Sequence, residues 1–132
     1  MSRLDQPLLP SAMLGILGGG QLGRFFVIAA HEMGYKVTVL DPDPNSPAGA
    51  IADIHLCKAF DDSSALEEIR NTCEAVTTEF ENVSADSMDF LSKKIYVSPS
   101  AESVRIAQYR VLEKTFLKES GLPVGPFEII RE

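Results

Sequence analysis

Residues 13–23 read Met-Leu-Gly-Ile-Leu-Gly-Gly-Gly-Gln-Leu-Gly, and this stretch decides the fold. The apolar run 13–17 is typical of a buried parallel strand. Gly18, Gly20 and Gly23 then follow with the spacing G-x-G-x-x-G, which favours a tight turn leading into a helix. Glycine allows that turn, the close approach of a phosphate, and close packing of the helix on the strand. The plainer alternative is a turn that needs glycine and binds nothing.

The helix that starts after Gly20 has apolar residues spaced i, i+3, i+4, i+7, i+8 and i+11. This spacing predicts one inward face, made of Leu22, Phe25, Phe26, Ala29, Ala30 and Met33. Gly34 stands where a left-handed residue would end the helix.

Downstream, short apolar runs alternate with helical patterns. We expect strands at 36–40, 55–58, 75–78, 95–97 and 127–130, with helices beginning at Ser64, Ser84 and Ser100. In the last helix, Val104, Ala107, Val111 or Leu112, and Phe116 are expected to face inward. Gly121 and Pro123 should end that helix.

The alternation predicts an α/β fold with a Rossmann-like parallel sheet, in the order 3-2-1-4 plus an extra strand. The chain reverses direction between strands 1 and 4 of such a sheet, and ligands bind at the carboxyl ends of the strands flanking that point. The loop 18–23 and the loop 79–82 are therefore the candidate site.

Composition excludes several classes. Twelve Lys and Arg against nineteen Asp and Glu give a net charge of −7, which argues against a nucleic-acid surface. The longest apolar run, 25–30, is too short to span a bilayer, and prolines interrupt the N-terminal segment where a signal peptide would need apolar residues. Cys57 and Cys73 form neither a disulfide framework nor a metal-ligand spacing. We expect a cytoplasmic protein without a metal site.

The loop 18–23 offers backbone amides near Gly20, Gln21 and Leu22 at a helix N-terminus, where an anion is favoured. Glu79 and Glu81 stand two residues apart in the other loop. One of these carboxylates could accept hydrogen bonds from a ribose 2′,3′-diol. Metal binding or acid–base work is a weaker alternative, because nothing nearby completes either, and a solvated acidic loop is the plainest one.

An NAD-binding domain of a dehydrogenase or regulator is the alternative from another class. Asp41 stands at the end of the second strand, where an acidic residue would take the ribose hydroxyls of NAD. Pro42 and Pro44 constrain the loop in which the adenosine would lie, which disfavours that interpretation. His31 and His55 have no clustered ligand or nucleophile and are interpreted as structural.

Four ordered motifs make the pattern specific. They are Gly-Gly-Gly-Gln-Leu-Gly-Arg at 18–24, Leu-Asp-Pro-Asp-Pro-Asn-Ser-Pro-Ala-Gly at 40–49, Thr-Glu-Phe-Glu-Asn-Val at 78–83, and Ser-Pro-Ser at 98–100 with Gln-Tyr-Arg-Val-Leu-Glu-Lys at 108–114. From about Met13 to its end, closing with Gly-Leu-Pro-Val at 121–124, the chain resembles the N-terminal part of the 5-(carboxyamino)imidazole ribonucleotide synthases of the ATP-grasp superfamily. The glycinamide ribonucleotide transformylases have a similar loop plan. Gln21 in place of glutamate, and the spelling of 79–82, favour the synthases.

The resemblance implies a pre-ATP-grasp domain of an ATP-dependent ligase in purine biosynthesis. In this reaction ATP phosphorylates bicarbonate to carboxyphosphate, and the amine of 5-aminoimidazole ribonucleotide takes the carboxyl group. By the same resemblance Gly20, Gln21 and Leu22 bind the substrate's 5′-phosphate, Glu79 binds its ribose hydroxyls, and Arg110 binds ATP. A homodimer coupled to the carboxyaminoimidazole ribonucleotide mutase is also implied.

Two prolines and the lack of a hydrophobic period predict a flexible leader at 1–12. The resemblance predicts the domain itself at 13–124 and the start of a truncated ATP-grasp domain at 125–132. Mg²⁺ and most ATP contacts would belong to absent domains, so the chain alone should not be catalytic and holds no catalytic residue. Tyr109 replaces a frequent acidic residue, which weakens the assignment of Arg110. Phe25 and Phe26 replace a more usual methionine-containing pair at positions expected in the core.

Overall fold

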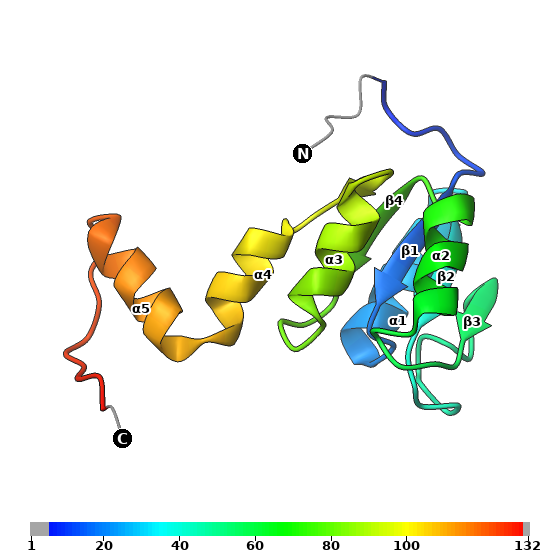
Figure 1. Cartoon of the computed structure of the whole chain (residues 1–132). Helices are drawn as coiled ribbons and strands as arrows, with labels where there is room; N and C mark the ends of the chain where they lie inside the picture. Colours follow the sequence, from blue (N-terminus) through cyan, green and yellow to red (C-terminus); the bar gives the residue numbers. More distant parts are fainter. Residues whose placement is uncertain (1–5, 131–132) are drawn as a thin grey trace.

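A computed structural model describes residues 6–130 of the chain (Figure 1). Its centre is a parallel sheet with the strand order β3-β2-β1-β4-β5. The strands are β1 (Met13–Leu17), β2 (Lys36–Leu40), β3 (Ile54–Leu56), β4 (Ala75–Thr78) and β5 (Tyr96–Val97). The predicted fold class and strand order are confirmed, with β3 one to two residues earlier than expected.

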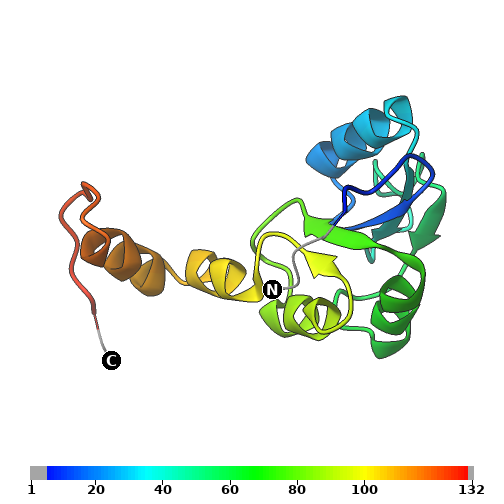
Figure 2. The same cartoon turned by 90° about the horizontal axis from the view of Figure 1, so that it is seen from above.

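Helices lie on both faces of the sheet. The helices of the described residues are α1 (Gln21–Glu32), α2 (Ser63–Thr72), α3 (Ala85–Ser92), α4 (Ala101–Gln108) and α5 (Arg110–Glu119). Figure 2 shows α1 on one face of the sheet and α2 with α3 on the other, while α4 and α5 extend to one side. Two clusters of buried apolar side chains follow from this layering, one on each face of the sheet.

Helix starts follow the expected side-chain caps, with one correction. Ser84 accepts a hydrogen bond from the Ser87 amide, and Ser100 accepts one from the Ser103 amide. The cap of α2 is Asp62 rather than Ser64, because its carboxylate reaches the amide of Ala65 at 2.9 Å. The carboxylate is the stronger acceptor for the exposed amides of a first turn.

The predicted inward face of α1 is right for Ala30 and in part for Phe26, which packs against the buried cluster, and is wrong for the other predicted positions. Leu22, Phe25 and Met33 are more than half exposed, whereas the buried positions are Gly23, Val27 and Ala30. The helix lies close to the sheet through Gly23, and the residues four and seven positions later share that face. Phe25 is therefore not a core residue.

Two substitutions distinguish these faces. We expect Val27→Ala to lower the free energy of unfolding by about 2 kcal/mol, because it deletes two fully buried methyl groups and leaves a cavity. Phe25→Ala should change it by less than about 0.5 kcal/mol. Urea unfolding followed by circular dichroism measures both, and a larger loss for Phe25→Ala would contradict the observed orientation of α1.

The predicted long helix after Ser100 is in fact two helices. The backbone of Tyr109 is extended (φ −112°, ψ 111°), which ends α4 and starts α5 in a new direction. Val104 is buried as expected, but Ala107, Val111, Leu112 and Phe116 are exposed. No residue of α5 is buried, so an inward face could not form there.

The predicted strand at 127–130 is also absent from the described residues. A strand needs a hydrogen-bonded neighbour, and residues 120–130 follow α5 away from the sheet (Figure 1). Residues 122–130 form neither helix nor strand, and Phe127 and Ile129 line a hollow with residues of α5. Apolar residues alone therefore do not establish a strand.

Asp53 ties the end of α1 to β2. Its Oδ2 lies 2.8 Å from His31 Nε2 and accepts a hydrogen bond of 2.8 Å from the Val37 amide. Partial burial would raise the pKa of Asp53, but the hydrogen bonds from Val37 and His31 outweigh it and hold that pKa below its ordinary value. His31 is therefore structural, as interpreted.

This lowered pKa predicts a pH dependence. Because the carboxylate is more acidic in the folded chain, its stabilising contribution is present above its unfolded pKa of about 3.9 and is lost as the pH falls through the folded value. Asp53→Asn should cost up to about 1 kcal/mol at pH 6 and less at pH 2.5. Urea unfolding at both pH values checks this, and an equal cost at the two would contradict it.

Cys73 is buried and Cys57 is exposed, and both thiols are free. Burial raises the pKa of the Cys73 thiol, which keeps it protonated.

Residues 8–11 contact the turn between α1 and β2, because Tyr35 Oη donates to the Leu8 carbonyl and the Ser11 amide donates to the Gly34 carbonyl. Residues 1–5 of the predicted leader and residues 131–132 of the predicted C-terminal segment lie outside the described residues. Between 6 and 130, no helix has the length and apolarity to cross a bilayer.

Candidate ribonucleotide-binding site

The two predicted loops meet at one edge of the sheet. β1 and β4 are parallel neighbours in which Leu17 is paired with Thr78, so the loops that follow them start side by side. The Glu79 amide donates to the Leu17 carbonyl at 3.2 Å and holds the two loop starts together. The two loops expected from topology to meet at the carboxyl ends of β1 and β4 therefore do meet there.

The Glu79 carboxylate lies directly on the start of α1. Its Oε1 accepts a hydrogen bond from the Gly20 amide at 2.8 Å, and its Oε2 accepts one from the Gly23 amide at 2.5 Å. This carboxylate thus satisfies two of the amides that a helix N-terminus leaves without a partner. The sequence pattern did not predict the contact, because the expected ligand of these amides was a phosphate.

The three glycines of the fingerprint are explained by this contact. A Cβ on Gly18 would lie 2.5 Å from Glu79 Cγ, one on Gly20 would lie 2.6 Å from Oε1, and one on Gly23 would lie 2.9 Å from Oε2. Gly18 also has a positive φ of 104°, which side-chain-bearing residues rarely adopt. The loop is therefore shaped around a carboxylate of its own chain.

The amides of Gln21 and Leu22 are the ones left over. Within residues 6–130, neither has a hydrogen-bond acceptor, and both residues are exposed. Two adjacent, accessible amides at a helix N-terminus form an anion-binding arrangement. Of the predicted phosphate ligands, Gln21 and Leu22 are thus available, whereas Gly20 already donates to Glu79.

The loop 41–49 closes the other side of the glycine loop. Asp41 Oδ2 accepts from the Gly19 amide at 2.7 Å, and Asp41 Oδ1 accepts from the Asp43 amide at 2.8 Å. The Ala48 amide donates to the Gly19 carbonyl at 2.8 Å. Asp41 is therefore engaged within the protein, and the loop occupies the region where the adenosine of NAD would have to lie. This arrangement counts against the dinucleotide alternative.

His55 supports the same loop. Its Nε2 lies 3.1 Å from the Asp41 carbonyl oxygen and 3.4 Å from Ser46 Oγ. Ser46 is buried, and its hydroxyl accepts a hydrogen bond from the Gly49 amide. The histidine is structural, as interpreted.

Glu81 and Arg110 lie at the outer side of the site. Glu81 is exposed, and its backbone carbonyl accepts a hydrogen bond from the Gln108 side chain at 2.7 Å. Arg110 begins α5 two residues after Gln108, with its side chain 77% exposed and 2.7 Å from Glu113 Oε2. Within the described residues, no contact joins Arg110 to the glycine loop or to Glu79.

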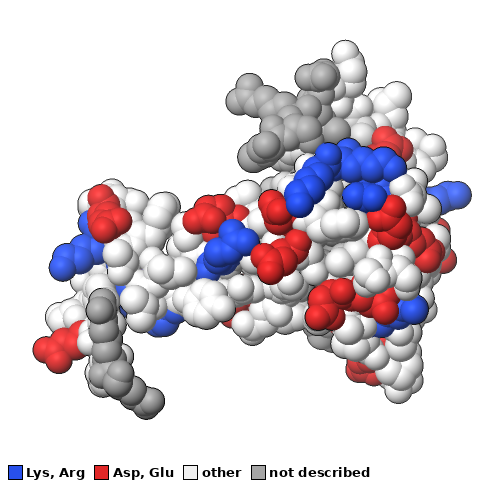
Figure 3. All heavy atoms as spheres, in the orientation of Figure 1, with Lys and Arg blue, Asp and Glu red and all other residues white. Residues whose placement is uncertain are grey.

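The charged side chains that contact the glycine loop are the carboxylates of Glu79 and Asp41, and both already accept hydrogen bonds from its amides. On the face shown in Figure 3, basic side chains gather near the upper end of the domain, and acidic side chains are scattered among uncharged ones. Among residues 6–130, no three His, Cys, Asp or Glu side chains are grouped so that they could hold a metal ion. An anionic ligand would therefore depend on the amides of α1.

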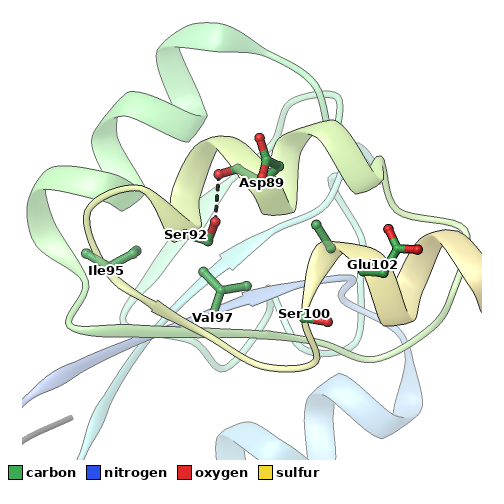
Figure 4. Close-up of a pocket in the computed structure, with 7 residues that line it drawn as sticks. Asp89, Ser92, Ile95, Val97, Ser100 and Glu102 are labelled. Atoms are coloured by element: carbon green, nitrogen blue, oxygen red, sulfur yellow. Dashed lines mark hydrogen bonds between the residues drawn. The ribbon is translucent and has the colours of Figure 1, made fainter. Parts of the chain in front are cut away.

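A second hollow lies elsewhere, between α3, β5 and the start of α4 (Figure 4). It measures about 210 Å³ and is lined by residues of α3, β5 and α4, among them Asp89, Ser92 and Glu102. Ser92 Oγ donates to the Asp89 carbonyl at 2.8 Å. None of the described residues that line this hollow is basic, so they offer no cation to a phosphate.

Comparison with known proteins shows the family to which the chain belongs. The family model described as "Ribonucleotide synthetase preATP-grasp domain" matches residues 11–108, and the chain belongs to that family. N5-carboxyaminoimidazole ribonucleotide synthase of Bacillus subtilis is 36% identical over 126 residues, which cover 96% of this chain and 33% of that protein.

Solved structures give the same result. The N5-carboxyaminoimidazole synthetase of Staphylococcus aureus complexed with ADP is 38% identical with a TM-score of 0.88, over 95% of this chain and 34% of that one. The synthase of Aspergillus clavatus in complex with ADP and 5-aminoimidazole ribonucleotide is 34% identical with a TM-score of 0.79, over 88% and 31%. The chain thus spans about a third of the length of the relatives that it matches.

Proposed function

We propose that this chain is the ribonucleotide-binding domain of an ATP-dependent ligase that carboxylates 5-aminoimidazole ribonucleotide. The observation that supports the proposal is the pair of amides, Gln21 and Leu22, that have no acceptor within residues 6–130 and lie at the same helix start as the Glu79 carboxylate. A 5′-phosphate on the amides and a ribose diol on the carboxylate satisfy both groups together.

Glu79 can serve the ligand while it holds α1. Each carboxylate oxygen has two acceptor directions, and each accepts only one hydrogen bond from the chain. The remaining directions can accept the 2′- and 3′-hydroxyls of a ribose. The roles of Gln21, Leu22 and Glu79 are therefore compatible, with Gly20 acting through Glu79 rather than on the phosphate.

ATP, Mg²⁺ and bicarbonate complete the proposed reaction. The described residues fit these ligands only in small part. Arg110 supplies one cation for an ATP phosphate, and the described acidic side chains are not grouped so that three of them could hold Mg²⁺. Arg110 would first have to leave Glu113. The proposal therefore assigns ribonucleotide binding to these residues, and the phosphorylation and carboxylation of the whole enzyme to parts that the longer relatives have.

Titration of the ¹⁵N-labelled chain with ribose 5-phosphate tests the site. We expect saturable shifts of the amide signals of Gln21, Leu22 and Glu79. Ribose without the phosphate should shift none of them measurably, because the phosphate supplies the charge-assisted contacts. NADH should leave Asp41 and its neighbours unmoved at the same concentration.

Each outcome decides between the candidates. Saturable NADH shifts centred on Asp41 would make this a dinucleotide-binding domain. No shift of the Gln21 and Leu22 signals with ribose 5-phosphate at millimolar concentration would refute the proposed phosphate site.

On the resemblance we also propose that the protein acts in the cytoplasm as a homodimer and passes its product to the carboxyaminoimidazole ribonucleotide mutase. The apolar surface of α1, formed by Leu22, Phe25, Ile28 and Met33, is exposed and is a surface that an assembly would bury. Sedimentation equilibrium tests for such a dimer up to about 1 mM chain, roughly the weakest dissociation constant of interest. A monomer at all of these concentrations would refute a dimer built by this domain.

A further inference from the structure

The joint between α4 and α5 is tied to the loop that carries Glu79. The side-chain amide of Gln108, the last residue of α4, donates to the carbonyl of Glu81 at 2.7 Å and also to the carbonyl of Val83. Val83 is fully buried, so one end of this tie is anchored in the core. Both acceptors belong to the segment that follows β4 directly.

The tie is placed where the chain changes direction. Tyr109, the next residue, is extended and separates α4 from α5, and Arg110 is the first residue of α5. No residue of α5 is buried, so the core does not fix the direction of this helix. Figure 1 shows α5 extending away from the sheet beyond this joint.

We propose that Gln108 is a positioning residue that fixes the start of α5, and so Arg110, relative to the loop carrying Glu79. The reason is that its two hydrogen bonds are the last side-chain ties between the described domain and α5 along the chain. The use of this link rests on the proposed function, in which Glu79 serves the ribonucleotide and Arg110 serves ATP. The link itself is a property of the chain without any ligand.

Electron–electron distances between two spin labels test the link. Cys57 is exposed and takes one label, Lys118→Cys on α5 takes the other, and buried Cys73 stays unlabelled in the folded chain. With Gln108 present, we expect one narrow distance distribution. Gln108→Glu keeps the shape but removes both donors.

Loss of two hydrogen bonds of ordinary strength should lower, by about 30-fold, the ratio of molecules in which α5 is held at this joint to molecules in which it is released. The distance distribution of Gln108→Glu should therefore broaden or gain a second maximum, while the urea midpoint of the domain changes little. Gln108→Met, which removes the donors without adding charge, should behave in the same way.

Asn82→Asp is the matched control, because it adds one negative charge to the same loop and leaves both carbonyl acceptors in place. Its distribution should match that of the unsubstituted chain. An unchanged distribution in Gln108→Met, or equal broadening in Asn82→Asp, would overturn the proposal, as would a broad distribution with Gln108 intact. None of these outcomes depends on ligand binding, so the proposed function is tested separately.

Discussion

Replacing Glu79 with alanine should lower the free energy of unfolding by about 3 kcal/mol, from the loss of two charge-assisted hydrogen bonds. The Gly20 and Gly23 amides would both lose their acceptor, and Gly23 is buried, so water replaces that bond poorly. Ribose 5-phosphate binding should be lost as well, since the diol contact is removed and the loop is no longer held. Urea unfolding and the amide titration measure the two effects.

Glu81→Ala is the control for this substitution. Glu81 is two residues away and exposed, and only its backbone carbonyl takes part in a hydrogen bond. It should alter the free energy of unfolding by less than about 0.5 kcal/mol. Equal losses for Glu79→Ala and Glu81→Ala would show that the contact with α1 contributes nothing.

Gly23→Ala should also destabilise the chain by about 3 kcal/mol, although alanine is the better helix former. Its Cβ would lie 2.8 Å from the Gly18 carbonyl oxygen and 2.9 Å from Glu79 Oε2. The first of these is a backbone atom, so α1 itself would have to move off the loop. Urea unfolding measures the loss.

Gly125→Ala provides the comparison for a glycine without such neighbours. No heavy atom lies within 4 Å of a Cβ built at Gly125, and its φ is not in the left-handed region. We expect a change within about 0.5 kcal/mol. If Gly23→Ala were equally neutral, the close approach of α1, loop and Glu79 would not be a requirement of the fold.

Local patterns sufficed to predict the sheet. The run 13–17, the glycine spacing and the strand–helix alternation are each consistent with a parallel sheet, and handedness then leaves few strand orders. The inward face of α1 was mispredicted because hydrophobicity alone was used. The helix approaches the sheet through Gly23, and a side chain's size rather than its polarity decides which face can come that close.

The position of the candidate site could be predicted from the sequence, but its internal contacts could not. Topology places the two loops together whatever their side chains, so their meeting at one edge of the sheet could be predicted. The contact of Glu79 with the Gly20 amide joins residues 59 positions apart. Nothing in the local sequence pattern distinguishes Glu79 from Glu81, so the contact could not be assigned to either one. The end of α4 at Tyr109 was missed because apolar spacing continues through 116 while the core does not.

A fixed carboxylate beside two open amides has a consequence for selectivity. If the proposed function holds, free inorganic phosphate on the Gln21 and Leu22 amides would face the Glu79 charge, whereas a phosphate ester of ribose would also bring hydroxyl donors to that carboxylate. The side chain that completes the loop would then favour sugar phosphates over the small anions that are most abundant in a cell. In that role Glu79 would act as an electrostatic filter.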